Sequence, residues 1–243
     1  MSEYVFRTED GRAVPAVTAE QMREVDRIAV EEFGLQILQM MENAGRNLAQ
    51  NVMDMAGEAA REITILAGAG GNGGGGLCCA RHLHNRGFHV RLVLDRKAAA
   101  MPGAAATQLQ ILQAAGLQAV DPYQATDAIR RADVVVDALI GYSLRGAPRG
   151  RAAELIEMCQ RAARVLSLDV PSGLDATTGS APGVVIRPER TLTLALPKTG
   201  LRDTGSDLYL ADIGIPPEVY HRLGLSIESP FGSRYWIPLE MGN

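Results

Sequence analysis

The stretch Ile63-Thr-Ile-Leu-Ala67, followed by Gly68-Ala-Gly-Gly-Asn-Gly-Gly-Gly-Gly76, decides the fold. A short, nearly all-apolar run that ends in glycines is typical of a β-strand covered on both faces. The glycines match the pattern G-x-G-x-x-G, and we expect them to form a loop leading into a helix over 77–86. Backbone N–H groups in such a loop can approach an anion, which a helix N-terminus also favours. A merely tight turn is the alternative interpretation of these glycines.

The same pattern recurs along the chain. Apolar strands are predicted over 90–94, 134–136 and 165–168, with helices over 105–115, 124–131 and 152–162 between them. Strands that alternate with helices form a parallel sheet through right-handed crossovers. Two further strands, over 190–196 and 208–212, are separated only by loops, so we expect the sheet to continue at that edge without helical crossovers.

Two helices are predicted before the first strand. Thr18-Ala-Glu-Gln21 is a capping box, which satisfies free backbone donors at a helix start, and a second helical pattern runs from Gln36 to about Ala60. The expected fold class is therefore α/β: a Rossmann-like three-layer sandwich with a mostly parallel sheet and two N-terminal helices. We expect one domain over 17–225, a polar N-terminal arm over 1–16 and a C-terminal arm over 226–243. Tyr235 and Trp236 of that second arm could dock on the body or on a second subunit.

The composition and charge of the chain argue against nucleic-acid-binding, membrane and secreted proteins. A net charge of -4 with scattered Lys and Arg provides no basic face for a phosphate backbone, which argues against a nucleic-acid partner. No apolar run approaches the ~20 residues of a membrane helix, and the polar start lacks a secretory signal. Cys78, Cys79 and Cys159 lack metal-site spacing, so we expect reduced core thiols and a cytoplasmic protein with no membrane partner.

Two aspartates follow predicted strands directly. Asp137 precedes the loop 141–147, and Asp169 precedes the turn Val170-Pro-Ser-Gly173, with Asp175 beyond it. Ligands of open α/β sheets bind at the carboxyl ends of the strands, so both aspartates and the glycine loop are expected to converge on one crevice. The alternative is that each aspartate merely caps a helix or a turn.

Five ordered segments carry a family resemblance. They are Met41-Glu-Asn-Ala-Gly45, the glycine run, and the stretches 136–146, 167–179 and 191–200. Together they resemble the NAD(P)H-hydrate epimerase family, that of the YjeF N-terminal domain, from about Val17 to Pro217. The kinase-like dehydratase domain that often accompanies this domain is absent from this chain.

The resemblance implies a cofactor-repair reaction. Members of the family interconvert the two C6 epimers of hydrated NADH and NADPH, so that a separate dehydratase can use one of them. The ring nitrogen beside C6 can help expel hydroxide, leaving a cation that a nearby aspartate stabilises and that water attacks on either face. A route through an opened ring is equally compatible with such a site.

The resemblance also assigns site residues and a cofactor. Asp169 corresponds to the family's substrate-contacting acid, which makes it the candidate catalytic group, and the expected cofactor is a potassium ion bound by Asn72, Asp137 and Ser172. Oxygen ligands of these types suit an alkali cation. A homodimer is expected, and Lys198 corresponds to a family lysine, although a solvated cation at a strand end is an equal alternative. The expected substrate-binding residues, besides Asp169, are Gly71, Asn72, Gly73, Gly74 and Gly75, and Gly141, Tyr142, Ser143, Leu144, Arg145, Gly146 and Ala147.

The glycine run departs from the family pattern at two positions. Gly71 replaces an asparagine and Gly75 replaces an aspartate of the pattern G-x-G-N-N-G-G-D-G. The backbone cradle is retained while an amide and a carboxylate are lost, which predicts nucleotide binding with slow turnover. A non-catalytic nucleotide- or protein-binding module is therefore one alternative function. An NAD-dependent dehydrogenase is another, since Asp95 stands about twenty residues beyond the glycines, where a ribose-binding acid belongs.

Overall fold

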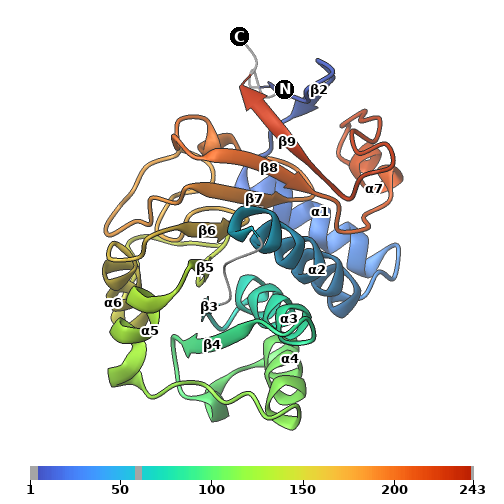
Figure 1. The fold of residues 1–243 in the computed structure, drawn as a ribbon. Helices are drawn as coiled ribbons and strands as arrows, with labels where there is room; N and C mark the ends of the chain where they lie inside the picture. The colour runs from blue at the N-terminus through green and yellow to red at the C-terminus, as the bar shows by residue number, and fades with distance from the viewer. Residues whose placement is uncertain (1–4, 58–61, 242–243) are drawn as a thin grey trace.

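The computed structural model describes residues 5–57 and 62–241, and these form a layered α/β structure around one mixed sheet (Figure 1). Its strand order is β2-β1-β9-β8-β7-β6-β5-β3-β4. The strands are β1 Val5–Arg7, β2 Ala13–Pro15, β3 Glu62–Ala67, β4 His89–Leu94, β5 Val134–Ala138, β6 Val165–Leu168, β7 Arg190–Leu194, β8 Asp207–Ala211 and β9 Trp236–Met241. The helices are α1 Ala19–Glu31, α2 Ile37–Ala56, α3 Gly71–His84, α4 Gly103–Ala114, α5 Ala125–Arg131, α6 Gly150–Cys159 and α7 Pro217–Arg222, with short 3₁₀ turns η1 Ala98–Ala100, η2 Pro122–Gln124 and η3 Thr199–Leu201.

The predicted parallel sheet is confirmed. Strands β8, β7, β6, β5, β3 and β4 pair in parallel, and only β9, β1 and β2 run antiparallel to their neighbours. Between β6 and β8 the described chain contains the turn η3 and no α-helix, as the loop-only spacing predicted.

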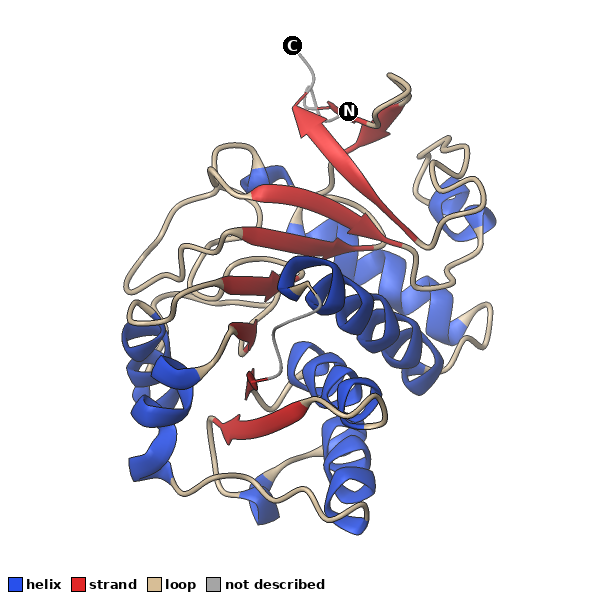
Figure 2. Ribbon diagram, in the orientation of Figure 1, coloured by secondary structure: helices blue, strands red, loops and turns tan. Residues whose placement is uncertain are grey.

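Both faces of the parallel strands are covered by helices, which explains the apolar runs (Figure 2). On β3, Ile63 and Ile65 pack into a cluster with α2, α3 and α4. Leu66 points to the opposite face, where α5 and α6 pack. Successive side chains of a strand point to opposite faces, so a strand buried on both must be apolar throughout. The Rossmann-like three-layer class is therefore correct.

The two N-terminal helices form where they were expected. Thr18 Oγ1 accepts the Gln21 N–H at 3.2 Å, and the Thr18 N–H donates to Gln21 Oε1 at 2.8 Å, so the capping box is present. Helix α2 ends at Ala56, earlier than predicted, because Gly57 follows with a φ of 71°. The rest of the predicted helix, 58–60, lies outside the described residues.

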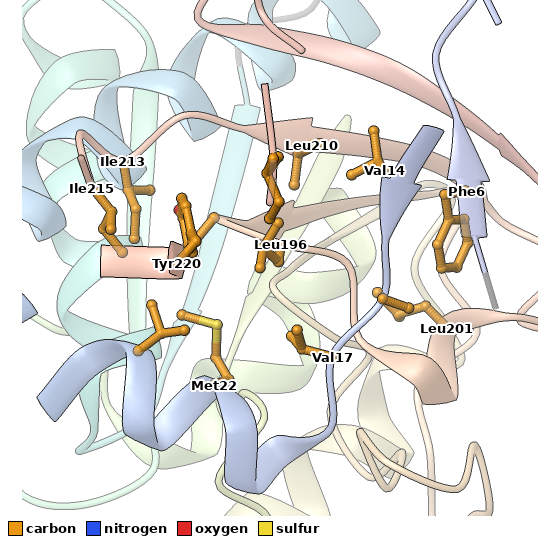
Figure 3. Close-up of a cluster of buried hydrophobic side chains, with 14 of the residues drawn as sticks. Phe6, Val14, Val17, Met22, Leu196, Leu201, Leu210, Ile213, Ile215 and Tyr220 are labelled. Atoms are coloured by element: carbon orange, nitrogen blue, oxygen red, sulfur yellow. The ribbon is translucent and has the colours of Figure 1, made fainter. Parts of the chain in front are cut away.

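Both terminal segments join the sheet, whereas the sequence suggested arms outside the domain. Strand β9 pairs with β8 and with β1, which carries the segment 5–15 into the same sheet. Phe6 and Val14 lie in a buried cluster with Leu210 (Figure 3). The Trp236 ring packs edge-on against Tyr209 with their centroids 5.4 Å apart, so it docks on the body of its own chain. Strands from both terminal segments therefore extend the sheet of the region 17–225.

The glycine run is helical from Gly71, whereas a loop as far as Gly76 was expected. Its glycines allow close approach: a Cβ on Gly76 would lie 2.5 Å from the Ala138 Cβ, and one on Gly74 would lie 2.6 Å from the Met41 sulfur. The first turns of α3 can therefore lie directly against β5 and α2.

The topology places a crevice beside this run. From β3 the chain passes to β4 on one side and then to β5 on the other, so the loops after β3 and β5 diverge at their carboxyl ends. Such a switch point is where α/β folds bind ligands. Cys78, Cys79 and Cys159 are free and buried, as predicted. Within 5–57 and 62–241, none of the helices has the length and apolar character needed to cross a membrane.

Candidate functional site

A pocket of about 1070 Å³ opens at this switch point. It is lined by side chains of α1 and α2, by the first residues of α3 and by the loops that follow β4, β5, β6 and β7. The predicted site residues that line it are Gly71, Asn72, Gly141, Tyr142, Ser143, Leu144, Arg145, Ala147 and Asp169, together with Lys198. The start of the glycine run and Asp169 therefore meet at one crevice, as expected, whereas Asp137 does not line it.

Asp169 and Lys198 form a buried ion pair in the pocket. Lys198 Nζ lies 2.5 Å from Asp169 Oδ1, and the two side chains are 1% and 4% exposed. The same ammonium donates to the Leu194 carbonyl at 2.8 Å, and Asp169 Oδ2 accepts the Tyr142 N–H at 2.9 Å. Lys198 is thus a buried residue of the pocket and not a solvated strand-end cation.

The backbone at this pair is unusual. Asp169 has a φ of 69° and Ala195 a φ of 62°, and no other described non-glycine residue has a positive φ. Left-handed backbone costs energy for these residues and clusters at functional sites. Asp169 therefore does more than cap a turn: its conformation turns the carboxylate toward Lys198.

Asp26 of α1 joins the same site, although the sequence analysis did not identify it. The Tyr142 hydroxyl donates to Asp26 Oδ2 at 2.5 Å, and Asp26 lines the pocket. Burial raises the pKa of Asp26, while the Tyr142 hydrogen bond and the charge of Lys198 oppose that rise. A signal was available: Asp26 lies four residues after buried Met22, so it is a carboxylate near the inward face of an amphipathic helix.

Asp137 and Ser172 are hydrogen-bonded to each other and do not line the pocket. Asp137 is fully buried and accepts four hydrogen bonds, from the Ser172 hydroxyl at 2.6 Å, the Ser172 N–H at 2.9 Å, the Ser167 hydroxyl at 2.8 Å and the Leu139 N–H at 3.2 Å. Burial raises the pKa of Asp137, and these hydrogen bonds oppose the rise. Every donor is neutral, so among the described residues no cation compensates this carboxylate.

Asn72 lies on the neighbouring helix start. Its amide Nδ2 donates to the Leu168 carbonyl at 3.2 Å. A Cβ on Gly141 would lie 3.2 Å from Asn72 Oδ1 and 3.0 Å from Asp169 Oδ2, so both side chains border the Gly141 backbone. Asp137 is therefore hydrogen-bonded directly to Ser172. Asn72 lies beside Asp169 and has no hydrogen bond to Asp137 or to Ser172.

Four predicted substrate-binding glycines do not line the pocket: Gly73, Gly74, Gly75 and Gly146. The first three lie inside α3 and face the protein. A Cβ on Gly75 would lie 2.9 Å from Leu168 Cδ2, whereas the corresponding position on Gly71 has no atom within 4 Å. Gly75 is thus a buried helical residue and not part of an exposed loop.

Arginines line another part of the pocket. Arg145 and Arg149 line the pocket, are exposed and make no hydrogen bond or ion pair with a described residue. Arg96 is held by Asp95 at 2.9 Å, which leaves that acid at the pocket wall but already paired. Guanidinium groups beside a helix N-terminus suit a phosphate-bearing ligand.

A second polar cluster lies between α2 and α3. Glu42, Cys78 and His82 bring three ligand-type atoms within 4.8 Å of one another, and Arg81 pairs with the same Glu42 carboxylate. Burial raises the pKa of Cys78 to about 12. Thiol and imidazole ligands do not suit an alkali cation, and Arg81 already supplies the positive charge, so this cluster is distinct from the predicted potassium site.

Comparisons with known proteins identify the family of the chain. The family model described as YjeF-related protein N-terminus matches residues 37–200. An NAD(P)H-hydrate epimerase of Dehalogenimonas lykanthroporepellens is 50% identical over 241 residues, covering 96% of each chain. One of Rhodopirellula baltica is 33% identical, covering 87% of this chain and 89% of that one.

A longer relative and a solved structure extend the comparison. A bifunctional NAD(P)H-hydrate repair enzyme Nnr of Moorella thermoacetica is 40% identical over 84% of this chain but only 41% of its own length. The crystal structure of yeast ynu0 has the same fold, with a TM-score of 0.80 over 93% of this chain and 100% of that chain at 23% identity. The chain therefore belongs to the NAD(P)H-hydrate epimerase family, that of the YjeF N-terminal domain.

Proposed function

We propose that the protein is an isomerase that interconverts the C6 epimers of hydrated NADH and NADPH. The observation that carries the proposal is the buried Asp169–Lys198 pair, which presents a carboxylate in a pocket at the switch point of the sheet. Two relatives that match most of the chain are named for this activity.

The pocket has complementary regions for a dinucleotide. The start of α3 and the side chains of Arg145 and Arg149 suit the phosphates, while Met40 and Met41 give an apolar wall for a ring. The loop 141–147 forms one side of the pocket through the residues described above. This polarity orients the hydrated nicotinamide toward Asp169.

The reaction requires a carboxylate beside the ring. When hydroxide leaves C6, positive charge develops on N1 and C6, and the Asp169 carboxylate stabilises it. Water then attacks C6 on either face, which interconverts the epimers.

Potassium is the proposed cofactor. Asp137 is a fully buried carboxylate whose donors are all neutral, which fits a cation held by hard oxygen ligands from Asp137, Ser172 and Asn72. Such an ion would compensate the Asp137 charge beneath the substrate. We also propose a cytoplasmic homodimer: the three free thiols suit a reducing compartment, and the exposed apolar side chains of Phe33, Ile37 and Leu38 at the turn between α1 and α2 suit a subunit contact.

Incubation with one pure hydrate epimer, followed by chromatographic separation of both epimers, tests the activity. The wild type is expected to produce the second epimer, and Asp169→Asn is expected to lose about 100-fold or more of the rate. Nucleotide binding without epimerisation would support the alternative of a non-catalytic binding module, for which Gly75 in place of the family aspartate is the supporting observation. A change in absorbance of the reduced cofactor would instead indicate a dehydrogenase.

A further inference from the structure

Tyr142 connects two carboxyl groups of the pocket. Its backbone N–H donates to Asp169 Oδ2 at 2.9 Å, and its hydroxyl donates to Asp26 Oδ2 at 2.5 Å. The two acids therefore approach the pocket from different segments, the turn after β6 and helix α1, at opposite ends of one tyrosine. A ring bound against Tyr142 can be reached by both.

The surroundings of the two acids differ. Asp169 has the Lys198 ammonium in direct contact, whereas the hydrogen bond of Asp26 comes from a phenol and no ion pair joins Asp26 to a described residue. The groups that act on Asp26 across the pocket are Tyr142, the Lys198 ammonium and the Asp169 carboxylate, and Asp26 in turn acts on Tyr220 of α7. Arg23, on its own helix, acts on Tyr142. Burial is the largest of these influences, and it favours the protonated carboxyl group.

One oxygen of Asp26 is available to a ligand. Asp26 lines the pocket; its Oδ2 accepts from Tyr142, while its Oδ1 has no hydrogen bond with a described residue. The other acids nearby are committed: Asp95 is paired with Arg96, and Asp175 lies outside the pocket wall, bonded to its own turn. Asp26 is thus the acid of the pocket that has both a free oxygen and no cation in contact.

We propose that Asp26 is a second catalytic residue of the epimerisation and donates a proton to the departing C6 hydroxyl, with Tyr142 as its positioning residue. The inference rests on the function proposed above. Paired carboxyl groups in contrasting environments commonly divide acid and base roles in this way.

The proposed steps balance. Asp26 gives its proton to the C6 hydroxyl, the C6–O bond breaks to release water, and the N1 electron pair forms a C6=N1 iminium. Water then attacks C6 on the opposite face, its oxygen forms the new C6–O bond, and its proton passes to Asp169 while the electron pair returns to N1. In the reverse direction the two carboxyl groups exchange roles, as microscopic reversibility requires, and the proton returns between them through pocket water.

Two measurements on the wild type and Asp26→Asn test the inference. Asp26→Asn is expected to bind the hydrate within a few fold of wild type and to lose about 100-fold of kcat. In water enriched in ¹⁸O, each wild-type epimerisation is expected to place one solvent oxygen on C6. The matched control is Glu24→Gln, an exposed carboxylate of the same helix, which should leave kcat unchanged.

The pH profile separates a proton donor from a structural carboxylate. A donor must be protonated, so kcat should fall as pH rises through the Asp26 pKa, which burial places above the ordinary aspartate value. Tyr142→Phe removes a hydrogen bond that lowers this pKa, so the fall should move to higher pH. Asp26→Glu should restore part of the rate, which loss of folding alone would not permit.

Two results would overturn the inference while leaving the proposed function intact: an Asp26→Asn rate within a few fold of wild type, or epimerisation with the original oxygen retained, which indicates ring opening. A wild type that binds the hydrate without epimerising it would refute the proposed function, and this inference with it.

Discussion

Lys198 Nζ contacts Asp169 Oδ1 at 2.5 Å although 29 residues separate them in the chain, and both side chains are almost completely buried. Two opposite charges withdrawn from water must compensate each other, because either one alone would carry an unpaid desolvation cost. The fold thus holds the carboxylate that we propose as catalytic together with its counter-charge.

Lys198→Met should destabilise the protein by about 3–5 kcal/mol, since it leaves the Asp169 carboxylate buried without a cation. Asp169→Asn should have a comparable effect for the opposite reason. The double variant should recover much of that loss because neither charge remains. Denaturant unfolding of all four proteins measures this coupling, and additive losses would contradict it.

Gly76→Ala should cost about 1–3 kcal/mol, because its methyl group would lie 2.5 Å from the Ala138 Cβ in a packed core. The matched control is Gly71→Ala in the same helix, where no atom lies within 4 Å. Its lower chain entropy should make it neutral or stabilising by up to about 1 kcal/mol. Thermal unfolding measures both, and equal effects would refute the close-packing explanation of the glycine run.

Asp137→Ala should weaken nucleotide binding in potassium buffer, because it removes the only charged ligand of the proposed cation site. Wild-type affinity should also fall when a large organic cation replaces potassium, and the variant should no longer respond to that exchange. Titration calorimetry in both buffers measures the response. Wild-type affinity that is identical in the two salts would remove potassium from the proposal.

Because of the two altered positions in the glycine run, the protein should bind the nucleotide but epimerise it slowly. From the sequence, Gly75→Asp is expected to raise the rate and Gly71→Asn to add to it. The structure changes this expectation because the two positions differ in the space around them. Gly71 has open space at the pocket, whereas an aspartate at position 75 must displace the Leu168 side chain. We therefore expect Gly71→Asn to fold normally and Gly75→Asp to gain rate only together with Leu168→Ala.

Epimerisation rates and melting temperatures of the single and combined variants measure this effect. Gly75→Ala with Leu168→Ala is the control, since it has the space without the carboxylate. A wild-type rate equal to that of relatives that carry the aspartate would show that this acid is dispensable.

The sequence by itself determined the fold class and much of the site. Apolar runs such as Ile63–Ala67 must be buried on both faces, and the capping box at Thr18 is a local arrangement, so neither depends on distant residues. Asp137 lies near the carboxyl end of β5 and Asp169 directly follows β6, and parallel strands bring their ends to one edge. The local sequence was sufficient to predict these features, because they depend only on hydrophobic periodicity and on the spacing of residues along the chain.

The contacts between segments that are remote in the sequence were decided only by the tertiary structure. The glycines of α3 lie directly against Met41 and Ala138, which are remote in the sequence, so no local pattern reveals why glycine is needed there. From the sequence, Lys198 could have been a solvated cation. In the structure it follows the turn at Ala195 and pairs with Asp169. Asp26 entered the site only because α1 packs beside Tyr142, since burial and charge compensation are properties of the folded neighbourhood and not of the residue.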